Sequence, residues 1–253
     1  MIGNSIEGAS AISTADATSI TVRGRDLAGD LMGRLTFTQY FYLLCTGREP
    51  TEKQTEFLDL LLVAIAEHGL VPTNLAARMT LAAGPESIQG AVAAGILGCG
   101  SVILGTAELC GQFLLRAEQS GDDLQNMVRK MRTDGEKAPG FGHPVHKPLD
   151  PRTERILQLA EERGAAGKYV ALARSAREAV HAAWGKPLTM NVSMAIAAVL
   201  LDLDFPPAIL KGVPILARTA SLLAHLAEEK ERPIGFYMAH HAEVSVRYDG
   251  GEA

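Results

Sequence analysis

Apolar residues recur at helical spacing along almost the whole of this 253-residue chain. One clear example starts at Thr51, which forms a predicted capping box with Gln54 ahead of an apolar stripe that ends at His68. Strand-type alternation is nearly absent, although a short run over 19–23 could pair briefly near the start. The periodicity therefore predicts an all-α fold of about eight to ten helices. The other helical patterns cover 85–97, 101–117, 122–131, 151–163, 168–183, 191–203 and 206–228.

The composition favours one large domain, or a large domain with a smaller partner. Hydrophobic residues make up 47% of the chain and charged residues 21%, which supports a sizeable core. A net charge of −5 without any block of Lys or Arg argues against nucleic acid as a partner. The sparse cysteines and the lack of a signal-peptide pattern predict a cytoplasmic protein.

One uncharged stretch, residues 91–107, is long enough to suggest a membrane span. However, it contains four glycines and is ended by Glu108. Glycines at this density let helices approach each other closely. We therefore predict a closely packed, buried helix pair here and no membrane partner.

The segment 140–152 carries two histidines, a lysine and an arginine on a backbone rich in Gly and Pro. Asp150 is a good N-cap and Pro151 suits the first helical position, so a helix is expected to begin here. Imidazole and guanidinium groups beside the N–H groups of a helix start favour an anion site. An ordinary Gly/Pro loop with solvated charges is the open alternative.

Motifs for nucleotides, metals and nucleophilic serine or cysteine are missing from the sequence. His143 and His146 lie three residues apart, which could indicate a metal site. Pro144 and the preceding glycines prevent the helix that would place both rings on one face, and no third ligand is obvious. The sequence thus predicts no metal site and no permanently bound cofactor.

The segment 140–152 also resembles the Gly-Phe-Gly-His-Arg-Val-Tyr-Lys…Asp-Pro-Arg segment of citrate synthases. The likeness continues in order along nearly the whole chain. The missing part of a full citrate synthase would lie between the Pro50 and His68 segments, as in citryl-CoA lyases and the citrate-synthase-like module of ATP-citrate lyase. The further matching positions are Arg23-Gly24, Asp26-Leu27, Leu43-Leu44, Gly47, Ala66-Glu67-His68, Thr73, Arg78, Asn191-Val192, Pro206, Arg218, His225-Leu226-Ala227-Glu228 and Arg232-Pro233.

The resemblance implies a citrate-synthase-like helical fold with a large and a small domain. Residues 1–104 and 205–253 would form the large, dimerising domain, and residues 105–204 the small domain with the CoA-side loop. Long apolar stretches at 91–115 and 206–226 also favour a homodimer or homotetramer.

The resemblance further implies a site for a di- or tricarboxylate and a coenzyme A (CoA) thioester as substrate. His68 and His143 would hydrogen-bond the hydroxyl or ketone and a carboxylate. Three arginines would clamp carboxylates, the last of them reaching across from the partner subunit: Arg152, Arg218 and Arg232. CoA would lie against Pro139, Gly140, Phe141, Gly142 and Lys147.

Two catalytic positions depart from the citrate synthase pattern. Ser193 stands where the synthases have the carboxylate that moves the methyl proton of acetyl-CoA, and Ile103 stands where they have a histidine that polarises the thioester. Pro144 and His146 also replace the family's Arg and Tyr. The carboxylate clamp is therefore expected without the residues of enolisation.

We accordingly expect a citryl-CoA lyase-like enzyme that cleaves a 3-hydroxy-3-carboxyacyl-CoA, with citryl-CoA giving acetyl-CoA and oxaloacetate as the reference case. His143 is the candidate base for the hydroxyl proton, and water bound by Ser193 could protonate carbon. Two alternatives stay open: a non-catalytic or regulatory protein that binds CoA thioesters and carboxylates, and an acyl-CoA hydrolase.

Overall fold

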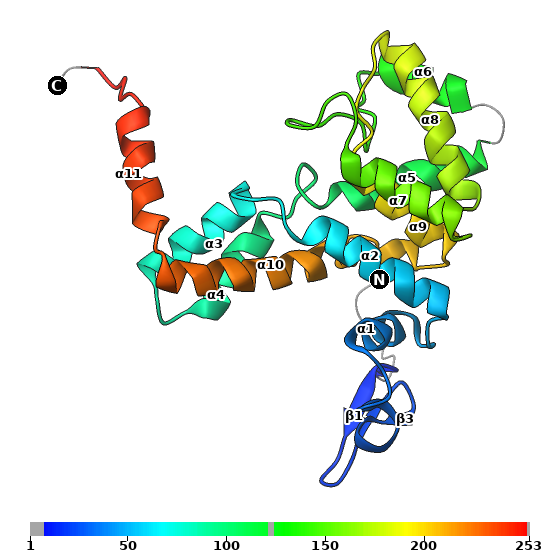
Figure 1. Ribbon diagram of the computed structural model, residues 1–253, viewed down its shortest axis with the longest axis vertical. Helices are drawn as coiled ribbons and strands as arrows, with labels where there is room; N and C mark the ends of the chain where they lie inside the picture. The colour runs from blue at the N-terminus through cyan, green and yellow to red at the C-terminus, as the bar shows by residue number, and fades with distance from the viewer. Residues whose placement is uncertain (1–7, 121–123, 252–253) are drawn as a thin grey trace. The chain divides into compact units, whose positions relative to one another are not determined.

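The computed structural model describes residues 8–120 and 124–251. It divides into two compact units, Met1–Asp59 and Leu60–Ala253, which are described separately (Figure 1). The predicted start of a helix at residue 122 lies outside the described residues. The expected division into large and small domains near residues 104 and 204 stays a prediction.

The first unit combines a small antiparallel sheet with helices. Strands β1 (Ser13–Ala15), β2 (Ile20–Val22) and β3 (Arg25–Asp26) pair in that order, which confirms the pairing expected near residues 19–23. A π-helix (Leu27–Leu31), α1 (Phe37–Thr46) and the start of α2 (Glu52–Ala66) follow. The core of the sheet end consists of Val22, Leu31 and Leu43.

Side chains cap both helices of this unit. Thr36 and Gln39 form a capping box at the start of α1, which ends at Gly47 with a positive φ of 77°. The capping box predicted for α2 is confirmed, because the Thr51 N–H donates to Gln54 Oε1 at 2.9 Å and the Gln54 N–H donates to Thr51 Oγ1 at 3.2 Å. Local sequence thus specifies where these helices begin.

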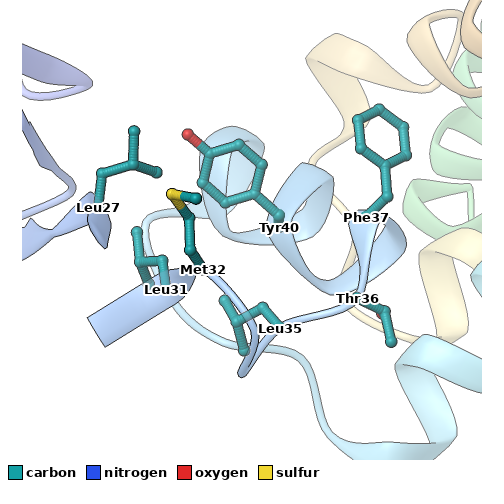
Figure 2. A pocket seen from close by; sticks show the side chains of 7 residues that line it. All are labelled: Leu27, Leu31, Met32, Leu35, Thr36, Phe37 and Tyr40. Carbon is teal, nitrogen blue, oxygen red and sulfur yellow. The ribbon is translucent and has the colours of Figure 1, made fainter. Parts of the chain in front are cut away.

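An apolar cavity of about 210 Å³ lies between the π-helix and α1 (Figure 2). Figure 2 shows leucine side chains, the sulfur of Met32 and the rings of Phe37 and Tyr40 around it. None of the described residues that line it is charged. Because it has no cation to compensate a negative charge, this cavity does not suit a carboxylate.

Apart from an isolated β-bridge between Phe141 and Met190, the regular structure described in the second unit is helical. Together with α1 and α2, its nine α-helices make eleven in the part of the chain that the structure describes, which confirms the all-α class. They are α3 (Pro72–Ala83), α4 (Ile88–Leu97), α5 (Thr106–Gln119), α6 (Leu124–Thr133), α7 (Pro151–Glu162), α8 (Lys168–Trp184), α9 (Val192–Asp202), α10 (Gly212–Glu231) and α11 (Gly235–Ser245), with a 3₁₀ turn at Pro207–Ile209.

The predicted number of helices was too low because α1, α3 and α11 were not singled out. The start of α3 lacks a side-chain cap, and so does the start of α11. Helix α11 also buries only Gly235, so it shows no core-facing stripe. Helix α11 therefore carries neither signal, whereas α3 lacks only the side-chain cap and buries Ala77 and Leu81 at helical spacing.

Helix α9 is the centre of one group of helices in this unit. Every residue from Val192 to Leu201 is buried, and α5, α7 and α8 contact this helix (Figure 1). A second group consists of α3, α4 and α10, whose shared core includes Ala77, Leu81, Ala91, Leu222 and Leu226. These two groups position the residues of the candidate site.

The uncharged stretch 91–107 is not a continuous helix pair. Helix α4 ends at Leu97 and α5 begins only at Thr106, five residues later than the pattern predicted. Between them Leu104 has a positive φ of 62°, and a Cβ on Gly105 would lie 2.5 Å from the Gly100 carbonyl oxygen. The chain folds back tightly at these glycines, which interrupts the helix.

A different stretch, Pro207–Glu231, passes a test of length and hydropathy for a membrane-spanning helix among the described residues. About 44% of its most apolar window is buried inside the protein. Its middle carries Arg218, which is 2% exposed and hydrogen-bonded to Asn74. A buried arginine paired inside the fold is typical of a core helix.

A buried ion pair joins α3 to α10. Arg78, 2% exposed, donates through Nε to Glu229 at 2.6 Å and through Nη1 to Glu228 at 2.7 Å. Glu229 also accepts from the N–H groups of Ile234 and Gly235 at the start of α11. Burial acts to raise the pKa of Glu229, but these hydrogen bonds outweigh it and lower the pKa. The ionised Glu229 therefore stabilises the fold above the pKa that it has in the unfolded state. This stabilisation is lost as the pH falls through its pKa in the folded state.

Replacing this arginine should destabilise the fold strongly. Arg78→Leu leaves the Glu229 carboxylate buried without its cation, so the free energy of unfolding should fall by about 3–5 kcal/mol. Urea denaturation followed by circular dichroism measures the change. The matched control is Arg116→Leu, whose side chain is 52% exposed and which should change stability by about 0.5 kcal/mol or less. Equal losses in both variants would contradict this role for the buried pair.

Candidate functional site

Backbone hydrogen bonds join the glycine-rich loop 139–149 to the segment that precedes α9. The Gly142 N–H donates to the Thr189 carbonyl at 2.7 Å, and the Asn191 N–H donates to the Gly140 carbonyl at 2.8 Å. Gly140 has a φ of 79°, and a Cβ there would lie 2.8 Å from Cys110 Sγ and 2.9 Å from Met194. Glycine is required at this position by internal packing, independently of any ligand.

Asp150 organises the starts of two helices. It is fully buried, caps α7 by accepting from the Arg152 N–H at 3.0 Å, and also accepts from the Val192 N–H at the start of α9 at 3.2 Å. The same carboxylate accepts from Arg152 Nε and Nη2, at 3.1 and 2.9 Å. Burial acts to raise the pKa of Asp150, but Arg152 outweighs it and lowers the pKa.

This arrangement changes how the segment can bind an anion. The predicted N-cap and helix start are confirmed, but the Arg152 N–H is already bonded to Asp150. The guanidinium, whose side chain is 20% exposed, is held in place and reaches the cavity described below. A ligand can therefore contact the Arg152 guanidinium, whereas the backbone N–H of Arg152 is already used.

Three imidazoles meet beside this loop. His68 follows α2, whereas His143 and His146 belong to the glycine-rich loop. The Nε2 atoms of His68 and His146 lie 3.3 Å apart, and the ring centroids of His143 and His146 lie 4.4 Å apart. One nitrogen from each ring lies within 4.8 Å of the other two. Folding therefore joins the two loop histidines to a partner 78 residues from His146.

The backbone determines the proton position on His143. Its Nδ1 accepts from the N–H groups of His146 at 2.8 Å and Val145 at 3.1 Å. A neutral ring with this hydrogen-bond pattern carries its proton on Nε2. Partial burial and the adjacent His146 lower the pKa of His143, which favours this neutral form. His143 Nε2 is thus a hydrogen-bond donor.

The sequence-based view that the loop histidines have no third candidate ligand was wrong, because His68 lies beside them. However, a protonated His143 Nε2 has no lone pair for a metal ion. Arg152 Nη2 lies 3.5 Å from that nitrogen, and a guanidinium repels a cation. The donor set fits an anion better than a metal ion.

Arg218 brings a buried positive charge to the same place. Its Nη1 donates to Asn74 Oδ1 at 2.9 Å, and its buried Nε has no hydrogen-bond partner among the described residues. Asn74 in turn donates to the Gly69 carbonyl at 2.7 Å. Burial lowers the pKa of Arg218, against the opposite effect of Glu67. A neutral amide does not compensate a guanidinium charge, so this residue can accept an anionic partner.

These groups line one cavity of about 380 Å³, which is within the size range of small-ligand sites. Its charged and titratable lining comprises only His68, His143, Arg152 and Arg218. No Asp or Glu belongs to its lining among the described residues. The cavity can therefore hold a ligand with several negative charges. The other lining residues are Ile65, Val71, Pro72, Val102, Ile103, Leu104, Thr106, Gly142, Pro144, Asn191, Val192 and Ser193.

Most of the expected site residues come together here. Ser193, 8% exposed, and Ile103 line this cavity together with the four cationic or imidazole groups. Lys147 lines an adjacent cavity of about 490 Å³, which also borders Gly142 and His143. The residues Pro139, Gly140 and Phe141 line neither cavity.

Arg232 does not line the cavity of about 380 Å³ described above. It ends α10, and its carbonyl accepts from Arg78 Nη2 at 3.1 Å. Its expected contribution from a partner subunit stays a prediction. Asn74, by contrast, was missed, because nothing in the sequence links it to Arg218, which lies 144 residues further along the chain.

Comparison with known protein families and curated proteins finds relatives of this chain. The family described as "Citrate synthase, C-terminal domain" matches residues 10–235. A putative citrate synthase 2 from Mycobacterium tuberculosis is 28% identical over 213 residues, which cover 81% of this chain and 57% of that protein. The chain thus spans about half the length of the curated relatives it matches.

Solved structures include one of very similar size. The citryl-CoA lyase from Hydrogenobacter thermophilus is 30% identical with a TM-score of 0.89, and the match covers 98% of this chain and 96% of that one. An ATP citrate lyase from Methanothrix soehngenii, in complex with citrate and coenzyme A, shares the fold with a TM-score of 0.79 at 22% identity, over 91% of this chain and 40% of that one. The family match, the helical architecture and the cationic cavity agree: the chain belongs to the citrate synthase family.

Proposed function

We propose that this protein is a carbon–carbon lyase of the citryl-CoA lyase type, which cleaves a 3-hydroxy-3-carboxyacyl-CoA to an acyl-CoA and a 2-keto acid. The observation that carries the proposal is the buried Arg218 guanidinium. Among the described residues, its only hydrogen-bonded side-chain partner is the neutral Asn74 amide, and the cavity that it lines has no carboxylate. The near-complete mutual coverage with a citryl-CoA lyase supports the same reaction class.

The arginines would hold the carboxylates of the substrate. A guanidinium matches a carboxylate in a two-pronged hydrogen bond and stays charged at any physiological pH. Arg152 is already oriented by Asp150, and Arg218 by Asn74, so little side-chain freedom would be lost on binding. This preorganisation favours a rigid di- or tricarboxylate over a monocarboxylate.

His143 would act on the oxygen that becomes the ketone. Cleavage removes a proton from the tertiary hydroxyl, forms the carbonyl and breaks the bond to the thioester α-carbon. Because His143 Nδ1 accepts two backbone N–H groups, its Nε2–H favours donation to that oxygen over the base role suggested by the sequence. A donor at this position stabilises the developing negative charge.

For the thioester half of the reaction, the protein offers fewer catalytic side chains. Ser193 and Ile103 replace the family's carboxylate and histidine, and no carboxylate lines the cavity. We infer that the α-carbon takes its proton from water near Ser193. The thioester would extend toward the adjacent cavity, where Lys147 could meet a CoA phosphate beside Gly142.

The same lack of a carboxylate supports a second candidate, a protein that binds CoA thioesters and carboxylates without breaking a carbon–carbon bond. Removing a placed general acid or base lowers a rate by about 10²–10⁴-fold, which is enough to abolish useful turnover in a slow enzyme. A thioester hydrolase is a third candidate, without a specific observation in its favour.

Incubation with citryl-CoA and mass spectrometry of all products separates these functions. We expect acetyl-CoA and oxaloacetate in stoichiometric amounts. Citrate with free CoA would identify a hydrolase. Unchanged citryl-CoA, together with saturable binding, would identify a non-catalytic binder and contradict the lyase.

A further inference from the structure

His68 and His146 form a hydrogen-bonded pair of imidazoles, and only one of them lines the carboxylate cavity. Their Nε2 atoms lie 3.3 Å apart with the rings nearly perpendicular, at 75°. His68 lines the cavity, whereas His146 does not belong to its lining. Two neutral imidazoles make such a contact only if one donates and the other accepts. One of the two rings therefore donates its Nε2 proton to the other.

The loop holds His146 in place from several sides. Its N–H donates to His143 Nδ1 at 2.8 Å, and its carbonyl accepts from the Thr189 hydroxyl at 3.1 Å. Its ring packs against that of His143 with an interplanar angle of 30°. A ring fixed in this way can impose one tautomer on His68, as a carboxylate does for a catalytic histidine.

The charges around the pair are also defined. Asp150 and Arg152 of α7 neutralise each other in an ion pair, Lys147 follows His146 in the chain, and Arg218 lines the cavity. The described residues place no hydrogen-bond partner on His68 Nδ1. If His68 donates through Nε2 to His146, then Nδ1 carries a free lone pair on a ring that lines the cavity.

We propose that His146 is a positioning residue that makes His68 the base for the substrate hydroxyl. This role rests on the lyase function proposed above. The hydroxyl proton moves to His68 Nδ1, the oxygen electron pair forms the carbonyl, and the broken carbon–carbon bond leaves its electrons on the thioester enolate. The Nε2 proton of His68 shifts toward His146, so the positive charge is shared between two rings. Water then supplies the proton that the enolate carbon takes up, and the hydroxide left behind recovers the proton held by the imidazole pair.

His146→Phe tests this role, because it keeps a ring of similar size but removes the acceptor. We expect kcat for citryl-CoA cleavage to fall by about 10²–10⁴-fold, the usual range for general acid–base catalysis. Citrate affinity should stay at the wild-type value, because His146 does not line the cavity. His146→Gln offers an amide oxygen to His68 and should recover part of the rate. His240→Phe, at an exposed position of α11, is the matched control and should leave the rate unchanged.

Spectroscopy distinguishes this role from simple structural support. In ¹⁵N-histidine NMR, His68 should show Nε2 protonated in the wild type and a mixture of tautomers in His146→Phe.

Three results would overturn the assignment. The first is a His146→Phe variant as active as the wild type, and the second is a loss of citrate affinity equal to the loss of kcat. The third is loss of cleavage in EDTA that Zn²⁺ restores, because metal-bound imidazoles cannot act as the base. A wild type that cleaves citryl-CoA normally alongside an unaffected variant would refute only this role. A wild type that yields no keto acid would refute the lyase function and this role with it.

Discussion

Arg218→Leu abolishes the stabilisation of this protein by citrate or oxaloacetate. Loss of one partner from a buried, hydrogen-bonded charge pair weakens binding by about 2–5 kcal/mol, which corresponds to roughly 30-fold to several thousand-fold in Kd. The unliganded variant should unfold at the wild-type temperature or above it. The reason is that the substitution removes a buried guanidinium whose Nε has no partner among the described residues, while Asn74 Oδ1 keeps the Thr73 hydroxyl as a donor.

Thermal-shift and calorimetric titrations with citrate, oxaloacetate and other keto acids measure this effect. Arg174→Leu provides the control, since Arg174 is 39% exposed and pairs with Glu161 on the surface. Arg218→Lys should be intermediate, because an ammonium keeps the charge but cannot form the two-pronged contact. Full ligand stabilisation of Arg218→Leu, or no binding of any keto acid by the wild type, would show that the carboxylate site is wrongly assigned.

Ser193→Asp restores exchange of the acetyl-CoA methyl protons with solvent. The substitution returns a carboxylate to a cavity that has none, and a placed base increases such a rate by about 10²–10⁴-fold. The increase in exchange rate should lie at the lower end of this range, because Ile103 still offers no donor to the enolate oxygen. Ser193 is only 8% exposed, so burial should also raise the pKa of the new carboxyl.

Proton NMR in D₂O follows the methyl signal directly, after circular dichroism has shown that each variant folds. Ser193→Asn, similar in size but without a base, is the matched control. The double variant with Ile103→His should exceed the sum of the single changes, because both residues act on the same enolate. Wild-type exchange as fast as that of Ser193→Asp would mean that another group already does this work.

Local sequence explains the helix starts that depend on hydrogen bonds between residues close together in the chain. The capping boxes at Thr36 and Thr51, the Asp150–Pro151 start of α7 and the Asn191 cap of α9 all follow from side chains within three residues of the helix start. The sequence separated the helical patterns 85–97 and 101–117, but it did not show that α5 begins only at Thr106, because a backbone reversal with positive φ at a leucine leaves no sequence signal.

The candidate site was only partly predictable for the same reason. The resemblance to citrate synthases named the residues that line the cavity, including His68, His143, Arg152 and Arg218. It did not reveal that Asn74 orients Arg218, or that His146 contacts His68. These partners lie 144 and 78 residues apart, and no local pattern couples positions so distant.

The amino-acid sequence by itself determined the helical class, the helix starts at polar caps, the family and the cationic character of the site. Each of these depends on periodicity, on short-range hydrogen bonds or on matched motifs. The tertiary structure alone decided which charge is left uncompensated and which imidazoles meet. Those properties depend on burial and on hydrogen-bond geometry between separate segments, and they exist only once α9, α10 and the glycine-rich loop have packed together.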